Sequence, residues 1–212
     1  MNKYLVLPII ILLISIDSFS QDKRDIGLTL GGNYYYGDFN ESLPLQSPAL
    51  GIGVIFRYNF DKHYSIRASA QYGSISGSYN GNYYLPGTFP STFSKSYLDA
   101  QIMGEFNFLS FSPIGERKKK ITPFVNLGIG ISQVGGAFIP NLPFGIGVKY
   151  TPIQRHTVAI EWRFQKTMVD NIDNYMPLNS NAIIHNNDWL AFVGLTYTYR
   201  LYNNSEICPV YK

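Results

Sequence analysis

Apolar and polar residues alternate with a period of two along nearly the whole chain after residue 25. One stretch shows the pattern clearly, because charged and large apolar residues take turns at Ile160, Glu161, Trp162, Arg163 and Phe164. Successive side chains of a β-strand point to opposite faces, so this pattern predicts a strand with one polar and one apolar face. Eight stretches follow it, at residues 26–36, 48–59, 64–75, 96–109, 121–132, 143–150, 157–169 and 188–201.

The length and spacing of these stretches favour a membrane barrel. Most are at least as long as the roughly 9–11 residues that a tilted transmembrane strand needs, whereas strands of globular proteins are typically about 5–6 residues long. Longer connections are expected at 37–47, 76–95, 133–142 and 170–187, and shorter ones at 60–63, 110–120 and 151–156. Long outer loops with short inner turns are typical of bacterial outer-membrane barrels. The predicted fold is therefore all-β, an eight-stranded antiparallel up-and-down transmembrane β-barrel.

The composition of the two faces predicts which of them lies outside. One face holds Leu127, Ile129 and Ile160 and carries almost no charge, with Lys166 as the exception. The other face holds the glycines Gly27, Gly31, Gly51, Gly53, Gly73, Gly128, Gly130, Gly145, Gly147 and Gly194. A soluble surface would be poor in glycine, which weakens strands, whereas a barrel of about eight strands has room inside only for side chains. We therefore expect the glycine face to line the lumen and the apolar face to contact lipid.

Charged residues on the lumen face form the first candidate site, as a structural charge network. They are Arg57, Arg67, Asp99, Glu105, Lys149, Glu161, Arg163 and Arg200. An unpaired charge in a dry lumen costs several kcal/mol, so pairing is expected. Aligning Tyr64 with Phe108 places Arg67 opposite Glu105 and predicts an ion pair between these two neighbouring strands. The network either plugs the barrel, which we prefer because such interiors are usually filled, or lines a narrow anion-selective pore.

Aromatic residues on the apolar face gather near the ends of the predicted strands. The inner rim would hold Tyr58, Phe60, Tyr64, Phe108, Tyr150 and Tyr199, and the outer rim Tyr34, Tyr36, Tyr72, Phe144 and Trp189. Aromatic rings are enriched in strands generally, but rings at both ends on the apolar parity are typical of two interfacial girdles.

The N-terminus has the pattern of an export signal. Lys3 precedes the apolar stretch 5–16, and the small residues Ser18 and Ser20 precede Gln21. A membrane anchor is the alternative, although a spanning helix needs about 20 apolar residues. We expect residues 1–20 to be a signal peptide, 21–201 an outer-membrane barrel and 202–212 a polar tail whose single cysteine, Cys208, cannot form an internal disulfide.

Composition and motifs offer little for catalysis. Charged residues make up 15% and the net charge is +3, so a nucleic-acid partner is not expected. His63 and Ser65 have the His-x-Ser spacing of some lipid-modifying barrels, but they fall at an inner turn, away from the outer leaflet where such enzymes work. Histidines and carboxylates show no metal-ligand spacing, and Gly128-Ile129-Gly130 lacks the helix that a phosphate loop needs. We expect no catalytic residue, cofactor or metal, and no enzymatic activity.

The expected outer loops 76–95 and 170–187 are rich in Tyr, Asn and Ser. Such loops suit contact with an extracellular protein or glycan, or serve only as spacers. Four functions remain open: a structural, adhesive or envelope-assembly barrel, a narrow channel for small solutes, a lipid-modifying enzyme, or a secreted soluble barrel that binds an apolar ligand.

Several stretches carry a resemblance to a known family, namely IGLTLGGNYYYGDFN, FRYNF, SIRASAQYGSISGS, ITPFVNLGIGIS, LPFGIGVKYTP and WRFQKTMVDNIDN. The chain resembles an uncharacterised family of small outer-membrane β-barrel proteins of the Bacteroidota, a domain of unknown function with OmpA/OmpX-like eight-stranded architecture. The resemblance implies the fold and an outer-membrane location but no reaction. The segment 194–199, GLTYTY, also looks like a recognition signal for the barrel-assembly machinery, which we expect as a partner together with outer-membrane lipid.

Overall fold

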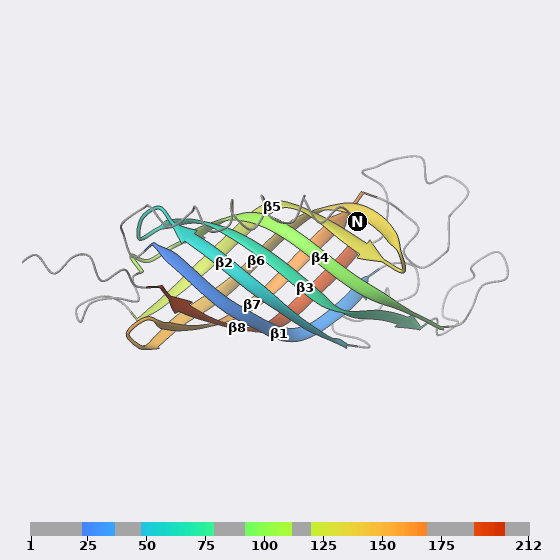
Figure 1. Ribbon diagram of the computed structural model, residues 1–212, viewed down its shortest axis with the longest axis horizontal. Coiled ribbons are helices and arrows are strands. Elements are labelled where there is room, and N and C mark those ends of the chain that lie inside the picture. Colours follow the sequence, from blue (N-terminus) through green and yellow to red (C-terminus); the bar gives the residue numbers. More distant parts are fainter. Residues whose placement is uncertain (1–22, 37–47, 79–91, 112–119, 169–188, 202–212) are drawn as a thin grey trace, which may run out of the picture.

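The computed structural model describes residues 23–36, 48–78, 92–111, 120–168 and 189–201. They form eight strands: β1 (Arg24–Tyr36), β2 (Ala49–Asn59), β3 (Tyr64–Ser78), β4 (Thr92–Asn107), β5 (Ile121–Val134), β6 (Ala137–Ile153), β7 (His156–Thr167) and β8 (Trp189–Arg200). Each strand pairs antiparallel with the next along the chain, and β8 pairs with β1 to close the barrel (Figure 1). The predicted fold class is confirmed. Within the described ranges, no helix is long and apolar enough to cross a membrane.

The barrel has a terminal end and a loop end. At the terminal end β1 begins and β8 ends, and the turn 60–63 joins β2 to β3. The opposite end, the loop end, holds the turn between β5 and β6. The β1–β8 ladder runs from Asp25 opposite Arg200 to Tyr36 opposite Trp189, so neither strand is left as an open edge.

The prediction of an outer loop at residues 133–142 is wrong. β5 continues to Val134 and β6 starts at Ala137, so only Gly135 and Gly136 connect them, with φ of 56° and 96°. A two-residue hairpin turn needs positive φ at its central positions, and glycine adopts this conformation without a steric penalty. Pro140 lies within the expected loop, but it pairs with Ile131 inside the β5–β6 ladder. Long and short connections therefore do not alternate at this hairpin.

The predicted register of β3 against β4 is wrong by two residues. Tyr64 lies opposite Phe106 rather than Phe108, and Arg67 lies opposite Met103. Glu105 faces Ser65 instead. A slip of two residues keeps every side chain on its own face, so the apolar pattern that fixed the face could not detect the error.

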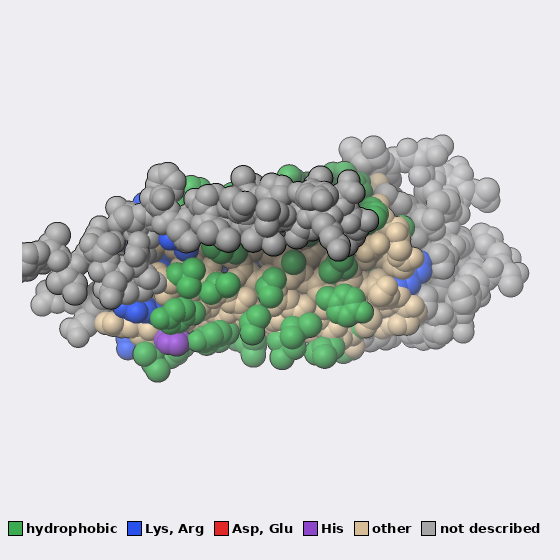
Figure 2. Space-filling model, in the orientation of Figure 1, with side chains coloured by type: hydrophobic (Ala, Val, Ile, Leu, Met, Phe, Trp, Pro, Cys, Tyr) green, Lys and Arg blue, Asp and Glu red, His purple; other side chains and the backbone are tan. Residues whose placement is uncertain are grey.

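The apolar face lies outside and the polar face inside, as expected. Leu127 and Ile129 are 67% and 66% exposed, whereas Arg67 is 0% and Arg163 2% exposed. Figure 2 shows hydrophobic side chains spread along the visible wall of the barrel. The alternative of a soluble barrel, which required the apolar face to point inward, is therefore wrong.

Close contact with the neighbouring strand on the lumen face explains the need for glycine at positions such as Gly128, which pairs with Met103 of β4. A Cβ added there would lie 2.7 Å from both Cα and Cγ of Met103 on β4. That distance is well inside the range of ordinary carbon–carbon contact, about 3.5–4.0 Å. The inward-facing glycines thus allow a narrow barrel to hold several large side chains.

Candidate functional site

All eight charged residues of the predicted network are buried inside the barrel: Arg57, Arg67, Asp99, Glu105, Lys149, Glu161, Arg163 and Arg200. A ninth buried charge, Asp25, was not predicted and is 4% exposed. The predicted first strand began at Ile26, two residues after the observed start at Arg24, although Asp25 shares its parity with Gly27 and so faces inward. In the described lumen, five cationic side chains therefore meet four carboxylates, and the expected positive excess is smaller than the sequence suggested.

Asp25 joins the first, second and last strands at the terminal end. Its carboxylate accepts hydrogen bonds from Arg200 Nε and, at 3.2 Å, from Arg200 Nη2. Arg57 Nη1 lies 3.4 Å from Asp25 Oδ2, and Asn59 Nδ2 donates to the same oxygen at 3.1 Å. Such pairing offsets the desolvation of the buried charges.

Glu105 on β4 lies among three cations from β2, β3 and β6. Arg57 Nε is 2.9 Å from Glu105 Oε1 although its N–H is not directed at that oxygen, and Arg57 Nη2 donates to Oε2 at 3.4 Å. Lys149 Nζ donates to Oε1, and Arg67 Nη1 is 3.7 Å from Oε2. Ser65 Oγ also donates to Oε1 at 2.9 Å. This single carboxylate therefore ties together the side chains of several strands.

Glu161 on β7 is the main partner of Arg67 on β3. Arg67 Nη1 and Nη2 donate to its two oxygens at 2.7 and 2.6 Å, a bidentate arrangement of the strongest kind of charged hydrogen bond. Asn126 Nδ2 adds a bond at 3.1 Å. β3 and β7 are not neighbours in the sheet, so this pair crosses the lumen. The predicted pair of Arg67 with Glu105 is present only as the longer 3.7 Å contact.

Asp99 and Arg163 lie nearer the loop end and contact mainly neutral groups. Asp99 accepts hydrogen bonds from Ser132 Oγ at 2.8 Å and Asn141 Nδ2 at 3.2 Å. Arg163 Nη2 donates to Gln71 Oε1 at 2.5 Å, and its guanidinium lies 4.9 Å from the centre of the Phe192 ring. That distance allows a favourable cation–π contact.

Beyond these charges, at the loop end, the lumen contains an apolar cluster that we call the apolar cap: Tyr35, Ile75, Tyr97, Val134, Ile139 and Leu190. Every member is at most 3% exposed. The Tyr97 hydroxyl donates to Gln165 Oε1 at 2.9 Å, which links the cap to the polar side chains below it. This apolar group on the lumen face was not predicted, although Tyr35 has the same parity as the inward-facing Asn33 and could have indicated it.

Gln101 marks a polar position in the middle of the lumen. It is 3% exposed, and neither its amide nitrogen nor its amide oxygen has a hydrogen-bond partner within the described part of the chain. An amide buried without a partner is costly, and buried waters usually satisfy such groups. We therefore expect bound water beside Gln101.

The predicted girdle residues of the terminal end lie on the outer wall. Phe60, Tyr64, Phe108 and Tyr150 are exposed, and Tyr58 and Tyr199 are partly exposed. Their rings contact one another, for example Tyr58 with Phe60 at 5.3 Å between centroids. Phe106 was not assigned to the girdle but joins Tyr64 to Phe108, with centroid distances of 5.1 and 5.3 Å.

The girdle residues of the loop end are on the same outer face. Tyr72 and Phe144 are exposed, Tyr34 and Trp189 are partly exposed, and the side chain of Tyr36 lies outside the description. Phe144 meets Trp189 edge to face at 6.1 Å.

The His63–Ser65 pair is not arranged for nucleophilic catalysis. His63 Nδ1 lies 2.9 Å from the carbonyl oxygen of Asn107, to which it can only donate. The Ser65 hydroxyl donates to Glu105 rather than to the imidazole, whereas an activated serine would need a base within hydrogen-bond reach. Among the described residues, no group of three or more His, Cys, Asp or Glu could hold a metal ion. The proposed signal peptide, most of the loops 76–95 and 170–187, the polar tail and Cys208 lie outside the described residues.

The barrel is similar to solved structures. Neisserial surface protein A matches with a TM-score of 0.52 and 10% sequence identity, covering 84% of this chain and 97% of that chain. Ail, the attachment invasion locus protein of Yersinia pestis, has a TM-score of 0.45 and 11% identity over 84% of this chain and 99% of that chain. The N-terminal β-barrel domain of Pseudomonas aeruginosa OprF has a TM-score of 0.44 and 11% identity, with coverages of 82% and 97%. At this identity, the likeness to the Neisserial protein shows the fold alone.

Sequence comparison adds a family. No curated protein sequence matches the chain. The family model described as "Domain of unknown function (DUF6089)" matches residues 3–210.

Proposed function

The chain belongs to this family of unknown function, and from the geometry of the barrel we propose that it is an outer-membrane protein with a closed lumen that acts through its loops and catalyses no reaction. The observation that carries the proposal is the Arg67–Glu161 pair, with distances of 2.6 and 2.7 Å between strands that are not neighbours. A filled, cross-linked interior supports a structural or adhesive role over transport.

The outer-membrane location is supported by the distribution of side chains over the wall. Exposed Leu127, Ile129 and Ile160 would be costly in water but favourable against acyl chains. Aromatic rings occur on the outer wall at both ends, where a bilayer has its two interfaces. Under this proposal residues 1–20 direct export, the terminal end faces the periplasm, and the barrel-assembly machinery recognises the segment 194–199.

Cell fractionation tests the location. The protein is expected in the detergent-dependent outer-membrane fraction, with a gel mobility that changes on boiling because the folded barrel is compact. Recovery in a soluble periplasmic or extracellular fraction without detergent would contradict the proposal.

Single-channel recording in a planar bilayer tests the closed lumen. The apolar cap and the ion pairs that cross the lumen should prevent a continuous aqueous path, so steady large openings are not expected. Such openings would favour the alternative of a narrow channel for small solutes.

Loop deletion tests where the function lies. Replacement of residues 79–91 or 170–187 by an Asn-Gly turn should reduce adhesion or impair growth while the boiled and unboiled mobilities remain different. A matched control changes Gly135-Gly136 to Asn-Gly, because this turn lies at the same end and tolerates that sequence. A lack of phenotype from both deletions would leave the loops as spacers.

Mass spectrometry of envelope lipids tests the absence of a reaction. A strain that lacks the protein should keep the same lipid structures as the parent. A lipid that loses or gains an acyl chain on deletion would instead favour the lipid-modifying alternative.

A further inference from the structure

A basic hollow opens at the terminal end of the barrel, beside the turn between β2 and β3. Its volume is about 470 Å³, and its lining includes Lys23, Phe60, Lys62, His63 and Arg200. This size falls in the range of roughly 300–1,000 Å³ that is typical of small-ligand pockets. The hollow is therefore large enough for the headgroup of a lipid.

The charges of the hollow favour an anionic group. Arg200 is bound to Asp25 inside the barrel, whereas Lys62 is exposed and Lys23 is half-buried at the rim. The carboxylate of Asp61 also lines the hollow. It already accepts the backbone N–H groups of its own turn at 2.6 and 2.7 Å, so it is held in place by the turn.

The hollow adjoins the apolar wall. Phe60 lines it and is 56% exposed on the outside of the barrel. The Phe60 ring contacts Tyr58, the last outward-facing residue of β2. An occupant could therefore place an anionic group among the lysines and an apolar chain against the wall, whereas a fully polar ligand would gain nothing from Phe60.

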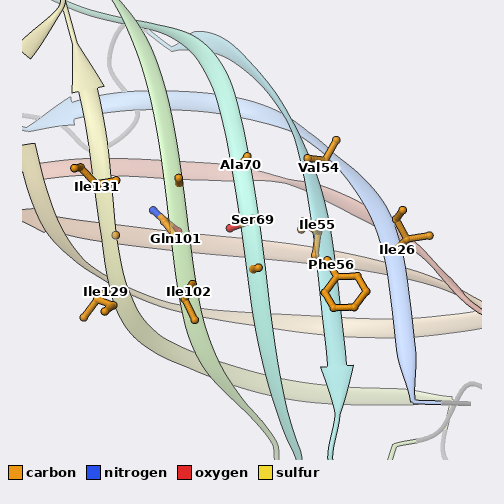
Figure 3. Close-up of a pocket in the computed structure, with 13 residues that line it drawn as sticks. Ile26, Val54, Ile55, Phe56, Ser69, Ala70, Gln101, Ile102, Ile129 and Ile131 are labelled. Atoms are coloured by element: carbon orange, nitrogen blue, oxygen red, sulfur yellow. The ribbon is translucent and has the colours of Figure 1, made fainter. Parts of the chain in front are cut away.

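Nearer the middle of the barrel, the outer wall has an apolar depression whose lining includes Phe56 and Ile102 (Figure 3). Ala70 on β3 lies opposite Ala100 on β4, and this pair is flanked by Val54 on β2 and Ile131 on β5. Two adjacent alanines between larger side chains lower the surface locally. The depression suits an extended acyl chain.

We propose that the hollow binds the phosphate group of an anionic phospholipid in the periplasmic leaflet, with one acyl chain lying over Phe60 and along the depression beside Ala70 and Ala100. The inference rests on the proposed outer-membrane location. Charge complementarity selects this occupant, because Lys23 and Lys62 lie where a headgroup would sit when the wall is in the acyl region.

Fluorescence quenching by brominated lipid tests the inference. Trp162 and Trp189 are changed to Phe and Phe60 to Trp, so that the only tryptophan lies at the hollow. The protein is inserted into phosphatidylcholine vesicles that contain either phosphatidylglycerol or phosphatidylcholine brominated near the headgroup. The phosphatidylglycerol should quench more strongly at equal mole fraction. Removal of each lysine, in Lys23→Gln and Lys62→Gln, should reduce the preference about fivefold.

Matched variants separate this site from general charge attraction. Lys95→Gln with Lys166→Gln removes two charges at the loop end and should leave the preference unchanged. Lys23→Arg with Lys62→Arg keeps the charges and should retain it. Equal quenching by the two lipids, or a preference that survives Lys23→Gln with Lys62→Gln, would overturn the inference.

Three further outcomes identify which part of the reasoning fails. If soluble peptidoglycan fragments displaced the brominated lipid from the hollow, their carboxylates would be the better ligand and the inference would be overturned. If the protein floated with the vesicles but showed no lipid preference, only the headgroup site would fail. If it did not insert at all, the proposed function would fail with it.

Discussion

Replacement of Glu161 by glutamine is expected to destabilise the barrel by about 3 kcal/mol, because it leaves Arg67 charged and buried without its main partner. Arg67 is 0% exposed and donates two hydrogen bonds to Glu161 at 2.6 and 2.7 Å. Breaking a buried pair by changing one partner typically costs about 3–5 kcal/mol. Glutamine keeps one acceptor, and Glu105 remains 3.7 Å from Arg67, so the lower part of that range applies.

Urea unfolding of the protein in phospholipid vesicles measures this loss, with tryptophan fluorescence and gel mobility as independent probes. Asp99→Asn is the matched control, since it removes one lumen carboxylate whose hydrogen bonds come from Ser132 and Asn141 rather than from a bidentate arginine. Its cost should be nearer the roughly 1 kcal/mol of a neutral hydrogen bond. The double variant Arg67→Met with Glu161→Leu should be less destabilised than the sum of its single changes, because no charge is then left alone.

A loss below about 1 kcal/mol for Glu161→Gln, together with additive effects in the double variant, would contradict this role of the Arg67–Glu161 pair. That result would mean that water or another side chain satisfies Arg67 as well as Glu161 does, and that the pair does not hold the two sides of the lumen together.

Three further predictions concern the turns and the wall. The Asp61 carboxylate accepts two backbone N–H groups at 2.6 and 2.7 Å, and these bonds lower its pKa. Its contribution to stability is therefore complete above the unfolded pKa of about 3.9 and is lost as the pH falls through the folded value, so the wild type should lose its advantage over Asp61→Asn below about pH 4 in urea titrations. Gly136→Ala should cost about 1 kcal/mol or more in urea unfolding because φ is 96° there; Gly104→Ala, which has only a backbone oxygen 3.8 Å from the added Cβ, should be nearly neutral. Ile129→Arg, in the middle of the wall, should cost about 2–4 kcal/mol in vesicles, while Ile153→Arg at the terminal end should cost about 0–1 kcal/mol; equal costs would contradict a bilayer around the wall.

Most of the fold could be predicted from the alternation of apolar and polar residues. This alternation placed Leu127 and Ile129 outside and Arg67 and Arg163 inside, because the side chains of a strand point to one or the other of its two faces. It also located all eight strands, but it failed at the β5–β6 hairpin. Proline and glycine are signals for a loop as well as for a tight turn, and only the pairing of neighbouring strands decides between them.

The partners of the lumen charges could not be obtained in the same way. Arg67 was matched to a neighbouring strand, whereas its main partner, Glu161, lies on a strand four places away in the sheet. In a barrel this narrow, long side chains reach across the lumen, and local strand pairing does not contain that information. Asp25 was missed for a simpler reason, since strand boundaries are the least certain part of a sequence prediction.

The closure of the barrel at the terminal end allows the connectivity of the chain to be changed. Leu201 donates its backbone N–H to the carbonyl of Arg24 at 2.9 Å, just beyond the bonds between Asp25 and Arg200. The two ends of the strand sequence are thus neighbours, and a short peptide could join them without disturbing a ladder. A circular permutant that is linked there and cut between Gly135 and Gly136 would keep every strand pair while exchanging the order of synthesis. The barrel therefore has no structurally privileged first strand.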